Sequence, residues 1–384
     1  MKKRILSVIM CIAMTAALTS CGGGAKPADK VEKKSEETGL KIAIVTSLTG
    51  VDDGSFHQEN YKGILSFIDA HPGSTVTPVQ EKTGAIDAAV KAVEDIVVDY
   101  DVMVCDGYQF AGIGEVAADN PDKKFILVDS FPSDAEGKEV ELDNVYAMTF
   151  KEQEAGFLAG MAAALSTDTR KVAVVNGIAV SSNVNYQYGF MSGVNYANKH
   201  YGTDTEIVEL ASYAGTDMTG ANVGGNYVGS FGDPANGKVV GDALIKAGCD
   251  IIFVAAGGSG TGVLTAIKES SAKDYMIGCD TDQYDDGVNG SDNVILTSAL
   301  KIMGANDKRV LETILDGSFK GGNYILGADS DSVGYVSDSS RCQLSSDVIE
   351  KIDKAYELIK NGTIVPADNF NGMTPDNFTG LDAE

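Results

Sequence analysis

The feature that most constrains the fold is a repeated alternation of short apolar segments with helical segments, beginning near residue 40. Short runs rich in Val, Ile and Ala are typical of strands that are buried on both faces, and longer periodic segments between them are typical of crossover helices. This alternation predicts a parallel sheet covered by helices. The first series contains expected strands at Lys41–Val45, Val76–Val79, Val102–Cys105, Phe125–Val128 and Asp143–Phe150, with a helix at Ala85–Val97.

A second series of the same kind follows a helical segment, Lys151–Leu165, whose many Ala and Gly residues predict close packing. Two successive α/β units in a chain of 384 residues predict two lobes, each a doubly wound parallel sheet. The second series contains expected strands at Lys171–Val175, Glu206–Leu210, Ile251–Ala255, Tyr275–Cys279 and Ile295–Thr297, and helices at Gln187–Asn198, Gly237–Lys246 and Val263–Ser270.

The N-terminus has the order of an export signal. Three basic residues precede an apolar run, Ile5–Leu18, which is too short for a stable membrane span. The following sequence, Leu18 to Gly22, resembles a bacterial lipobox, which implies cleavage before Cys21 and lipidation of that cysteine. We therefore expect a signal peptide over residues 1–20 and a disordered tether over residues 21–39.

Composition excludes several classes of protein. The formal net charge of -25 disfavours binding to nucleic acid and to anionic lipid, so any membrane association is expected through the anchor alone. Cys105, Cys249 and Cys279 lie in apolar strand-like segments and read as small core residues. With no CxxC motif and only three histidines, the sequence predicts neither a zinc site nor another metal site.

Motifs for nucleotide chemistry and for catalysis are also missing from the sequence. The glycine-rich segment Gly257–Gly262 ends before Val263, so it is not a dinucleotide-binding GxGxxG motif. No P-loop, EF-hand or GxSxG elbow occurs, and the scattered histidines give little support for a Ser-His-Asp triad. We therefore expect a binding protein without a cofactor, and an enzyme acting on nucleosides is a third, weaker interpretation.

Polar and aromatic side chains gather just after the expected strands. In open α/β sheets, ligands bind at the carboxyl ends of strands, so these side chains are candidates for a binding site. A phenylalanine offers a face for stacking, a carboxylate accepts hydrogen bonds, and a lysine donates them. Phe56 could instead be a core residue, Asp129 and Asp280 could be helix N-caps, and Lys301 could be a surface lysine.

Six segments together resemble the basic membrane protein family, the purine-nucleoside-binding lipoproteins of ABC importers. The resemblance runs in order from about residue 40 to about residue 305. The segments are GVDDGSFHQENYKGI, FKEQEAGFLAGMAAAL, GSFGDPANGK, GCDIIFVAAGGSGTGV, IGCDTDQ and TSALK.

The resemblance implies a periplasmic-binding-protein-like fold of type I, with two lobes, a hinge and a nucleoside in the cleft. It further implies that two aromatic rings enclose the base, that carboxylates hold the base edge and the ribose, and that a lysine and glycine backbone assist. The second aromatic ring falls in the segment Tyr227–Phe231, where Phe231 is favoured. The implied ligand-binding residues are Phe56 and Phe231 for the base faces, Asp129 for the base edge, Asp280 and Lys301 for the ribose, Gly257 or Gly258 for a backbone contact, and Ser55 and His57 in the same motif.

Two residues depart from the family pattern near the base. The family usually has asparagine where this chain has His57, and aspartate where it has Ser47. The resemblance therefore implies a nucleoside, and a purine before a pyrimidine, but it does not identify which one.

The sequence thus predicts a lipid-anchored, extracytoplasmic binding protein that delivers nucleosides to an ABC permease and its ATPase. The alternative is a binding protein of the same fold for a sugar or another small metabolite. The expected division is a first lobe of residues 40–148 plus 280–320, a second lobe of residues 149–279 plus 321–345, and a C-terminal helix and tail of residues 346–384.

Overall fold

The computed structural model describes residues 39–384. The predicted signal peptide, Cys21 and nearly all of the predicted tether lie outside the described residues. Within the part that is described, no helix has both the length and the hydropathy needed to cross a membrane.

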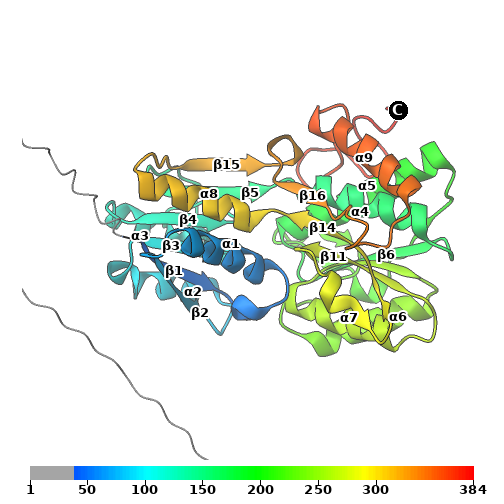
Figure 1. The fold of residues 1–384 in the computed structure, drawn as a ribbon, viewed down its shortest axis with the longest axis horizontal. Coiled ribbons are helices and arrows are strands. Elements are labelled where there is room, and N and C mark those ends of the chain that lie inside the picture. Colours follow the sequence, from blue (N-terminus) through cyan, green and yellow to red (C-terminus); the bar gives the residue numbers. More distant parts are fainter. Residues whose placement is uncertain (1–38) are drawn as a thin grey trace, which may run out of the picture. The chain divides into compact units, whose positions relative to one another are not determined.

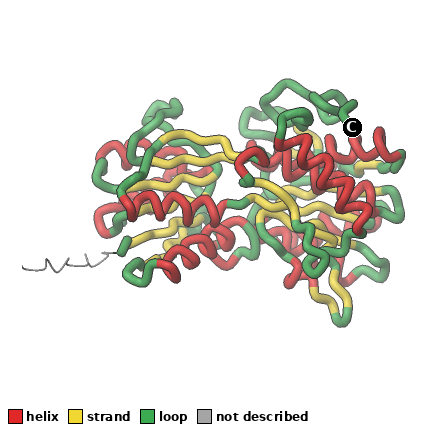
Figure 2. The backbone as a smooth tube through the Cα atoms, turned by 45° about the horizontal axis from the view of Figure 1, so that its top comes forward, coloured by secondary structure: helices red, strands yellow, loops and turns green. Residues whose placement is uncertain are grey.

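The first sheet has six strands, all parallel (Figures 1 and 2). Its central strands are apolar and fully buried, as expected for a sheet that is covered on both faces. The edge strand β2 contains Pro78, which an edge position tolerates because one side needs no ladder hydrogen bond. In spatial order the strands are β15 (Gly322–Leu326), β5 (Val145–Phe150), β4 (Lys124–Val128), β3 (Val102–Asp106), β1 (Lys41–Thr46) and β2 (Thr75–Gln80).

The second sheet also has six strands, of which only the edge strand β16 is antiparallel to its neighbour. In spatial order they are β16 (Val333–Tyr335), β14 (Ile295–Lys301), β11 (Tyr275–Asp280), β10 (Ile251–Ala255), β6 (Lys171–Asn176) and β7 (Glu206–Ile207). Two small hairpins complete the strands: β8 (Gly215–Thr216) with β9 (Asn222–Gly224), and β12 (Val288–Asn289) with β13 (Asp292–Asn293).

Helices cover the faces of both sheets (Figure 2). They are α1 (Phe56–Ala70), α2 (Ile86–Glu94), α3 (Gly114–Asp119), α4 (Glu152–Ser166), α5 (Ser181–Tyr201), α6 (Pro234–Lys246), α7 (Gly260–Glu269), α8 (Met303–Asp316) and α9 (Ser346–Lys360). The predicted α/β fold with two parallel-sheet lobes is therefore confirmed, and the expected strands and helices agree with the observed ones to within a few residues at most boundaries.

The chain passes between the two sheets three times, and this corrects part of the expected division. It crosses from β5 to α4, from β14 to α8, and from β15 to β16. Residues 280–301, assigned above to the first lobe, therefore belong to the second sheet, and β15, assigned above to the second lobe, belongs to the first. The assignment went wrong because strand pairing over such long separations is not visible in local sequence patterns.

Helices α4 and α5 pack with their backbones in close approach. Every residue of α4 from Glu152 to Ala164 is buried, so this helix is apolar nearly all round and lies in the interior. Two pairs of glycines, each pair four residues apart, form the contact between the helices. They are Gly156 and Gly160 on α4, and Gly189 and Gly193 on α5. The close packing predicted from the Ala and Gly content of α4 is confirmed.

We predict that Gly160→Ala destabilises the protein by about 1–3 kcal/mol, because the added methyl group would meet the carbonyl oxygen of Phe190. Helix propensity alone favours Ala over Gly by about 1 kcal/mol, so the expected loss opposes the intrinsic preference. Urea unfolding measures the change, with the exposed Ser181→Ala on α5 as the control. A Gly160→Ala variant more stable than the parent would contradict the backbone contact.

Candidate functional site

A cavity of about 160 Å³ lies between the two sheets and is lined from both of them. Its walls come largely from the carboxyl ends of strands, as the position of ligand sites in α/β sheets predicts. From the first sheet these residues are Ser47 after β1, Asp106 at the end of β3 and Asp129 after β4. From the second sheet they are Ile178 after β6, Ala255 in β10, Asp280 in β11 and Lys301 in β14.

Most of the residues predicted from the sequence line this cavity, and two lie behind it. Those that line it are Phe56, His57, Asp129, Phe231, Gly257, Asp280 and Lys301. Ser55 does not line the cavity, but its hydroxyl donates a hydrogen bond of 2.8 Å to Asp280. Gly258 is also outside the lining, where a side chain would crowd Thr49 and the backbone of Phe231. The structure thus brings the predicted set together, and their contacts with a ligand remain a prediction.

Lys301 is the centre of a buried charge network. Its ammonium group lies 2.6 Å from Asp129 Oδ2 and 3.5 Å from Glu152 Oε1, and only 2% of its side chain is exposed. Burial alone would lower the pKa of this lysine, but the charges of Asp129 and Glu152 raise it well above its ordinary value. Lys301 is therefore charged at every physiological pH, and the surface-lysine alternative is excluded.

Three aromatic rings enclose the same ammonium group. Its Nζ lies 4.9 Å from the ring centre of Phe56, 5.6 Å from that of Phe150 and 5.9 Å from that of Tyr186. These separations allow cation–π attraction, which is strongest where water is excluded. The ring of Phe56 is half-buried, so it packs against the core and also presents a surface to the cavity. Both readings of Phe56, as core residue and as cavity wall, are therefore correct.

Asp129 and Asp280 occupy strained backbone positions at the ends of their strands. Their φ angles are 61° and 68°, in the left-handed region that few residues other than glycine adopt. Asp280 accepts hydrogen bonds from the hydroxyls of Ser55 and Tyr186, at 2.8 and 3.2 Å. Neither aspartate caps a helix, so the N-cap alternative is wrong for both.

Asp53 fixes the beginning of α1 and so orients the two ring residues that follow it. Its carboxylate accepts hydrogen bonds from the backbone N–H groups of Ser55, His57 and Gln58, at 3.0 to 3.1 Å. A carboxylate in this position satisfies the free N–H groups of the first helical turn and favours the positive end of the helix dipole. The hydroxyl of Ser55 is consequently available for Asp280 instead of capping its own helix.

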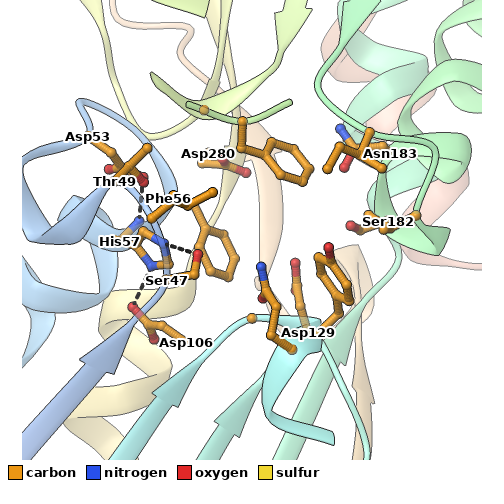
Figure 3. A pocket seen from close by; sticks show the side chains of 18 of the residues that line it. Ser47, Thr49, Asp53, Phe56, His57, Asp106, Asp129, Ser182, Asn183 and Asp280 are labelled. Atoms are coloured by element: carbon orange, nitrogen blue, oxygen red, sulfur yellow. Dashed lines mark hydrogen bonds and ion pairs between the residues drawn. The ribbon is translucent and has the colours of Figure 1, made fainter. Parts of the chain in front are cut away.

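His57 lies between a hydroxyl and a carboxylate (Figure 3). Its Nε2 is 3.3 Å from Ser47 Oγ, and its Nδ1 is 3.3 Å from Asp106 Oδ2. This is the order of atoms in a Ser-His-Asp triad, an arrangement for which the scattered histidines of the sequence gave little support. Burial alone would lower the pKa of His57, but Asp106 and Asp53 raise it above its ordinary value.

The wall opposite Phe56 comes from the beginning of α5, which the sequence analysis missed (Figure 3). It contributes Ser182, Asn183 and Tyr186 to the cavity. Asn183 is fixed by donating from its Nδ2 to the carbonyl oxygen of Ala255, at 2.6 Å. The strand-end argument could have identified Ser182 and Asn183, because they follow the predicted strand Lys171–Val175, but it was not applied there.

Phe231 reaches the cavity from the loop before α6, and its ring lies against glycines. A side chain at Gly177 would collide with this ring. Gly257, whose φ of 52° lies in the left-handed region, is packed beside the same residue. Tyr227, the other aromatic residue in this segment, is buried outside the lining, and its hydroxyl donates to Gln187. Of the two, only Phe231 is available as a cavity wall.

The two parallel-sheet lobes with a cavity between them define the fold class, the two-lobed periplasmic-binding-protein type. Solved structures of ABC transporter solute-binding proteins share the fold. One from Aeropyrum pernix K1 superimposes with a TM-score of 0.71 at 20% identity, covering 87% of this chain and 94% of that one. One from Conexibacter woesei gives 0.62 at 19% identity, covering 86% and 99%.

Sequence comparison gives the family. The chain belongs to the Bmp family, described as ABC transporter substrate-binding protein PnrA-like, which it matches over residues 41–217 and 211–369. The resemblance stated from the six motifs is thereby confirmed. Proteins of this family bind substrates for ABC transporters and are not enzymes, so this chain is a binding protein.

Several characterised relatives match most of the chain. A CD4+ T-cell-stimulating antigen of Listeria innocua is 29% identical over 381 residues, covering 95% of this chain and 98% of the relative. The ABC transporter nucleoside-binding protein BmpA of Lactococcus lactis is 28% identical over 346 residues, covering 85% and 88%. Basic membrane protein D of Borreliella burgdorferi is 32% identical over 240 residues, covering 61% and 62%.

We predict that Lys301→Met lowers the free energy of unfolding by about 3–5 kcal/mol at about pH 8, because it leaves buried carboxylates uncompensated. Burial already raises the pKa of Glu152 to about 7 with Lys301 present, and without the lysine it rises further. The folded variant then binds protons that the unfolded chain has released, so its stability falls as pH rises.

Urea unfolding at about pH 5 and about pH 8 tests this dependence. Stability of the variant should recover at the lower pH, relative to the parent. Lys91→Met is the control, since that lysine forms ion pairs with exposed partners and its loss should change stability little, and equally at both pH values. Equal losses for Lys301→Met at both pH values would contradict the network.

Proposed function

We propose that this protein captures nucleosides, purines in particular, in the cavity between its lobes and delivers them to an ABC permease and its ATPase. The observation that carries the proposal is the pair of phenylalanines, Phe56 and Phe231, that line one cavity from different lobes. Two flat rings on opposite lobes suit a flat ligand, and stacking on an aromatic ring contributes roughly 1–3 kcal/mol per base. The relative from Lactococcus lactis, named a nucleoside-binding protein, supports the same assignment.

The polar groups suit the two other parts of a nucleoside. Asp129 uses Oδ2 for Lys301, while its buried Oδ1 has no hydrogen-bond partner within residues 39–384, so this oxygen is available for a base N–H. Asp280 and Lys301 are then assigned to the ribose hydroxyls, as acceptor and donor. A purine with an N–H at its polar edge, such as guanosine or inosine, satisfies Asp129 best.

The charge of the cavity favours a nucleoside over a nucleotide. The lining holds one lysine, Lys301, against four carboxylates, and the negative charge disfavours a phosphate group. The four are Asp53, Asp106, Asp129 and Asp280.

The N-terminal sequence and the family support a location on the outer side of the membrane. A substrate-binding protein must meet its permease on the outer side of the membrane, and a lipid on Cys21 would hold it there. A single acyl chain gives only reversible binding, so a diacylated cysteine is suited to stable attachment. The acidic surface gives the protein domain no attraction of its own for anionic lipid.

We predict that the protein binds inosine, guanosine and adenosine, and that Phe56→Ala weakens all three by about tenfold or more, through the loss of stacking. Calorimetry measures the affinities, with uridine and ribose as comparison ligands and Phe370→Ala, an exposed phenylalanine elsewhere, as the control. Binding of ribose without binding of any nucleoside would favour the sugar-binding alternative. If Phe56→Ala binds all three purines as the parent does, Phe56 is not a wall of the base site.

We predict that the mature chain begins at a lipidated Cys21 and that Cys21→Ser prevents both the lipidation and the cleavage. The order of basic residues, apolar run and lipobox-like sequence is the reason. Metabolic labelling with a fatty acid, followed by membrane fractionation, provides the measurement, and Ser20→Ala is a conservative control in the same segment. Lipid label on the N-terminus of Cys21→Ser would show that the anchor has been assigned wrongly.

A further inference from the structure

Ser47, His57 and Asp106 form a buried hydrogen-bonded chain that reaches the cavity surface. The exposed fractions of the three residues are 9%, 5% and 0%, and all three line the cavity. Asp106 and Ser47 each lie 3.3 Å from a different ring nitrogen of His57 (Figure 3). A change in hydrogen bonding at Asp106 can therefore affect Ser47 through the single imidazole of His57.

The geometry fixes which nitrogen carries the proton when His57 is neutral. Burial raises the pKa of Asp106 to about 6, so above that pH its carboxylate is ionised and can only accept a hydrogen bond. Nδ1 must then hold a proton and donate it to Asp106. Nε2 is then an unprotonated acceptor, and the hydroxyl of Ser47 donates to it. In this state Ser47 presents only oxygen lone pairs to the cavity, so it acts toward a ligand as an acceptor.

Protonation of His57 reverses this direction. Both ring nitrogens of an imidazolium are donors, so Nε2 now donates to the oxygen of Ser47. The hydroxyl proton of Ser47 is displaced from its former partner and is free to point into the cavity. Ser47 then acts toward a ligand as a donor. One proton on His57 thus changes the hydrogen-bonding polarity at a fixed point of the cavity wall without moving any heavy atom.

We propose that Ser47 is a specificity-determining residue whose polarity toward the ligand is switched by protonation of His57, with Asp106 holding the ring in one tautomer. The proposal rests on the proposed function, since it assumes that the ligand is a nucleoside. It also gives a physical role to His57 and Ser47, the two residues that the sequence analysis singled out near the base.

The surroundings of His57 favour its protonated form. Asp53 at the start of α1, Asp106 on β3 and Asp280 on β11 face it with negative charge. Asp129 on the neighbouring strand is also close enough to interact, and Lys301 beside it partly offsets these charges. Burial lowers the pKa of His57, but the carboxylates outweigh it and leave the pKa above its ordinary value of 6.5. The ring therefore keeps its proton to a higher pH than a free imidazole does.

Inosine and adenosine are the appropriate probes because they differ only in the polarity of one edge. Inosine carries an oxygen acceptor at position 6 and an N–H donor at position 1, and adenosine carries the opposite pair. A wall group that changes from acceptor to donor must therefore favour one nucleoside in one state and the other nucleoside in the other. A hydroxyl that faces the ribose or a ring face would instead affect both nucleosides alike.

The test measures the ratio of the inosine and adenosine dissociation constants by calorimetry at about pH 5.5 and about pH 8, the range over which an unperturbed histidine changes its charge. We expect the ratio to change by about tenfold or more, because one polarity leaves a buried group unpaired. Ser47→Ala should make the ratio independent of pH, and so should His57→Gln. His71→Gln, which changes a histidine outside the cavity, should keep the parent's dependence.

A second readout follows the switch directly. Nitrogen NMR of the His57 ring should show a proton on Nδ1 at high pH and on both nitrogens at low pH. Asp106→Asn should lower the apparent pKa of the ring, because it removes a facing charge. A proton on Nε2 alone at high pH would overturn the tautomer assignment, and with it the proposal.

The outcomes separate this proposal from the one on which it rests. If both nucleosides bind and their ratio stays the same at both pH values, the switch is wrong while the proposed function stands. If the ratio changes in the parent and equally in Ser47→Ala, the sensor is His57 or another group, and Ser47 does not determine specificity. If neither nucleoside binds at either pH, the proposed function fails and the switch fails with it.

Discussion

The buried charge of Lys301 is the interaction on which the site depends. This lysine ends a strand of the second sheet, whereas its nearest partner, Asp129, follows a strand of the first. Glu152, its other partner, begins the helix that follows the first crossing between the lobes. Because an isolated charge in this position would be prohibitively costly, the three groups must stay together. The ion pair therefore ties the lobes to each other at the cavity, where a ligand is expected to lie.

The close packing of α4 against α5 supports this ion pair from one side. The glycine pairs of α4 and α5 let the two helices approach closely, and Glu152 and Tyr186 project from these helices toward Lys301. On the other side, Asp53 holds the first turn of α1 and so sets the positions of Phe56 and His57. The side chains that line the cavity thus stand on helices that are held in place by contacts to their backbone. A preorganised site requires such support.

Local pattern was sufficient to predict most of the elements and the general location of the site, because strands and helices differ in hydrophobic period and ligand residues follow strand ends. It could not predict partners that only the folded chain defines. Lys301 was expected beside the ribose but not in an ion pair with Asp129, and Ser47, His57 and Asp106 gave no recognisable motif. The lobe boundaries failed for the same reason, since β15 pairs with a strand 176 residues earlier in the chain.

The three crossings between the lobes have a consequence for the order in which the protein can fold. The first sheet lacks an edge strand until β15 has been made, and the second lacks β16 until a few residues later. Neither lobe is a continuous stretch that could close by itself during synthesis, and distant strand pairings slow folding because long loops must close first. The N-terminal signal proposed above would send the chain across a membrane in an extended state. A topology that postpones completion of both lobes to the last quarter of the sequence suits that route, because most of the chain can be translocated before either lobe can close.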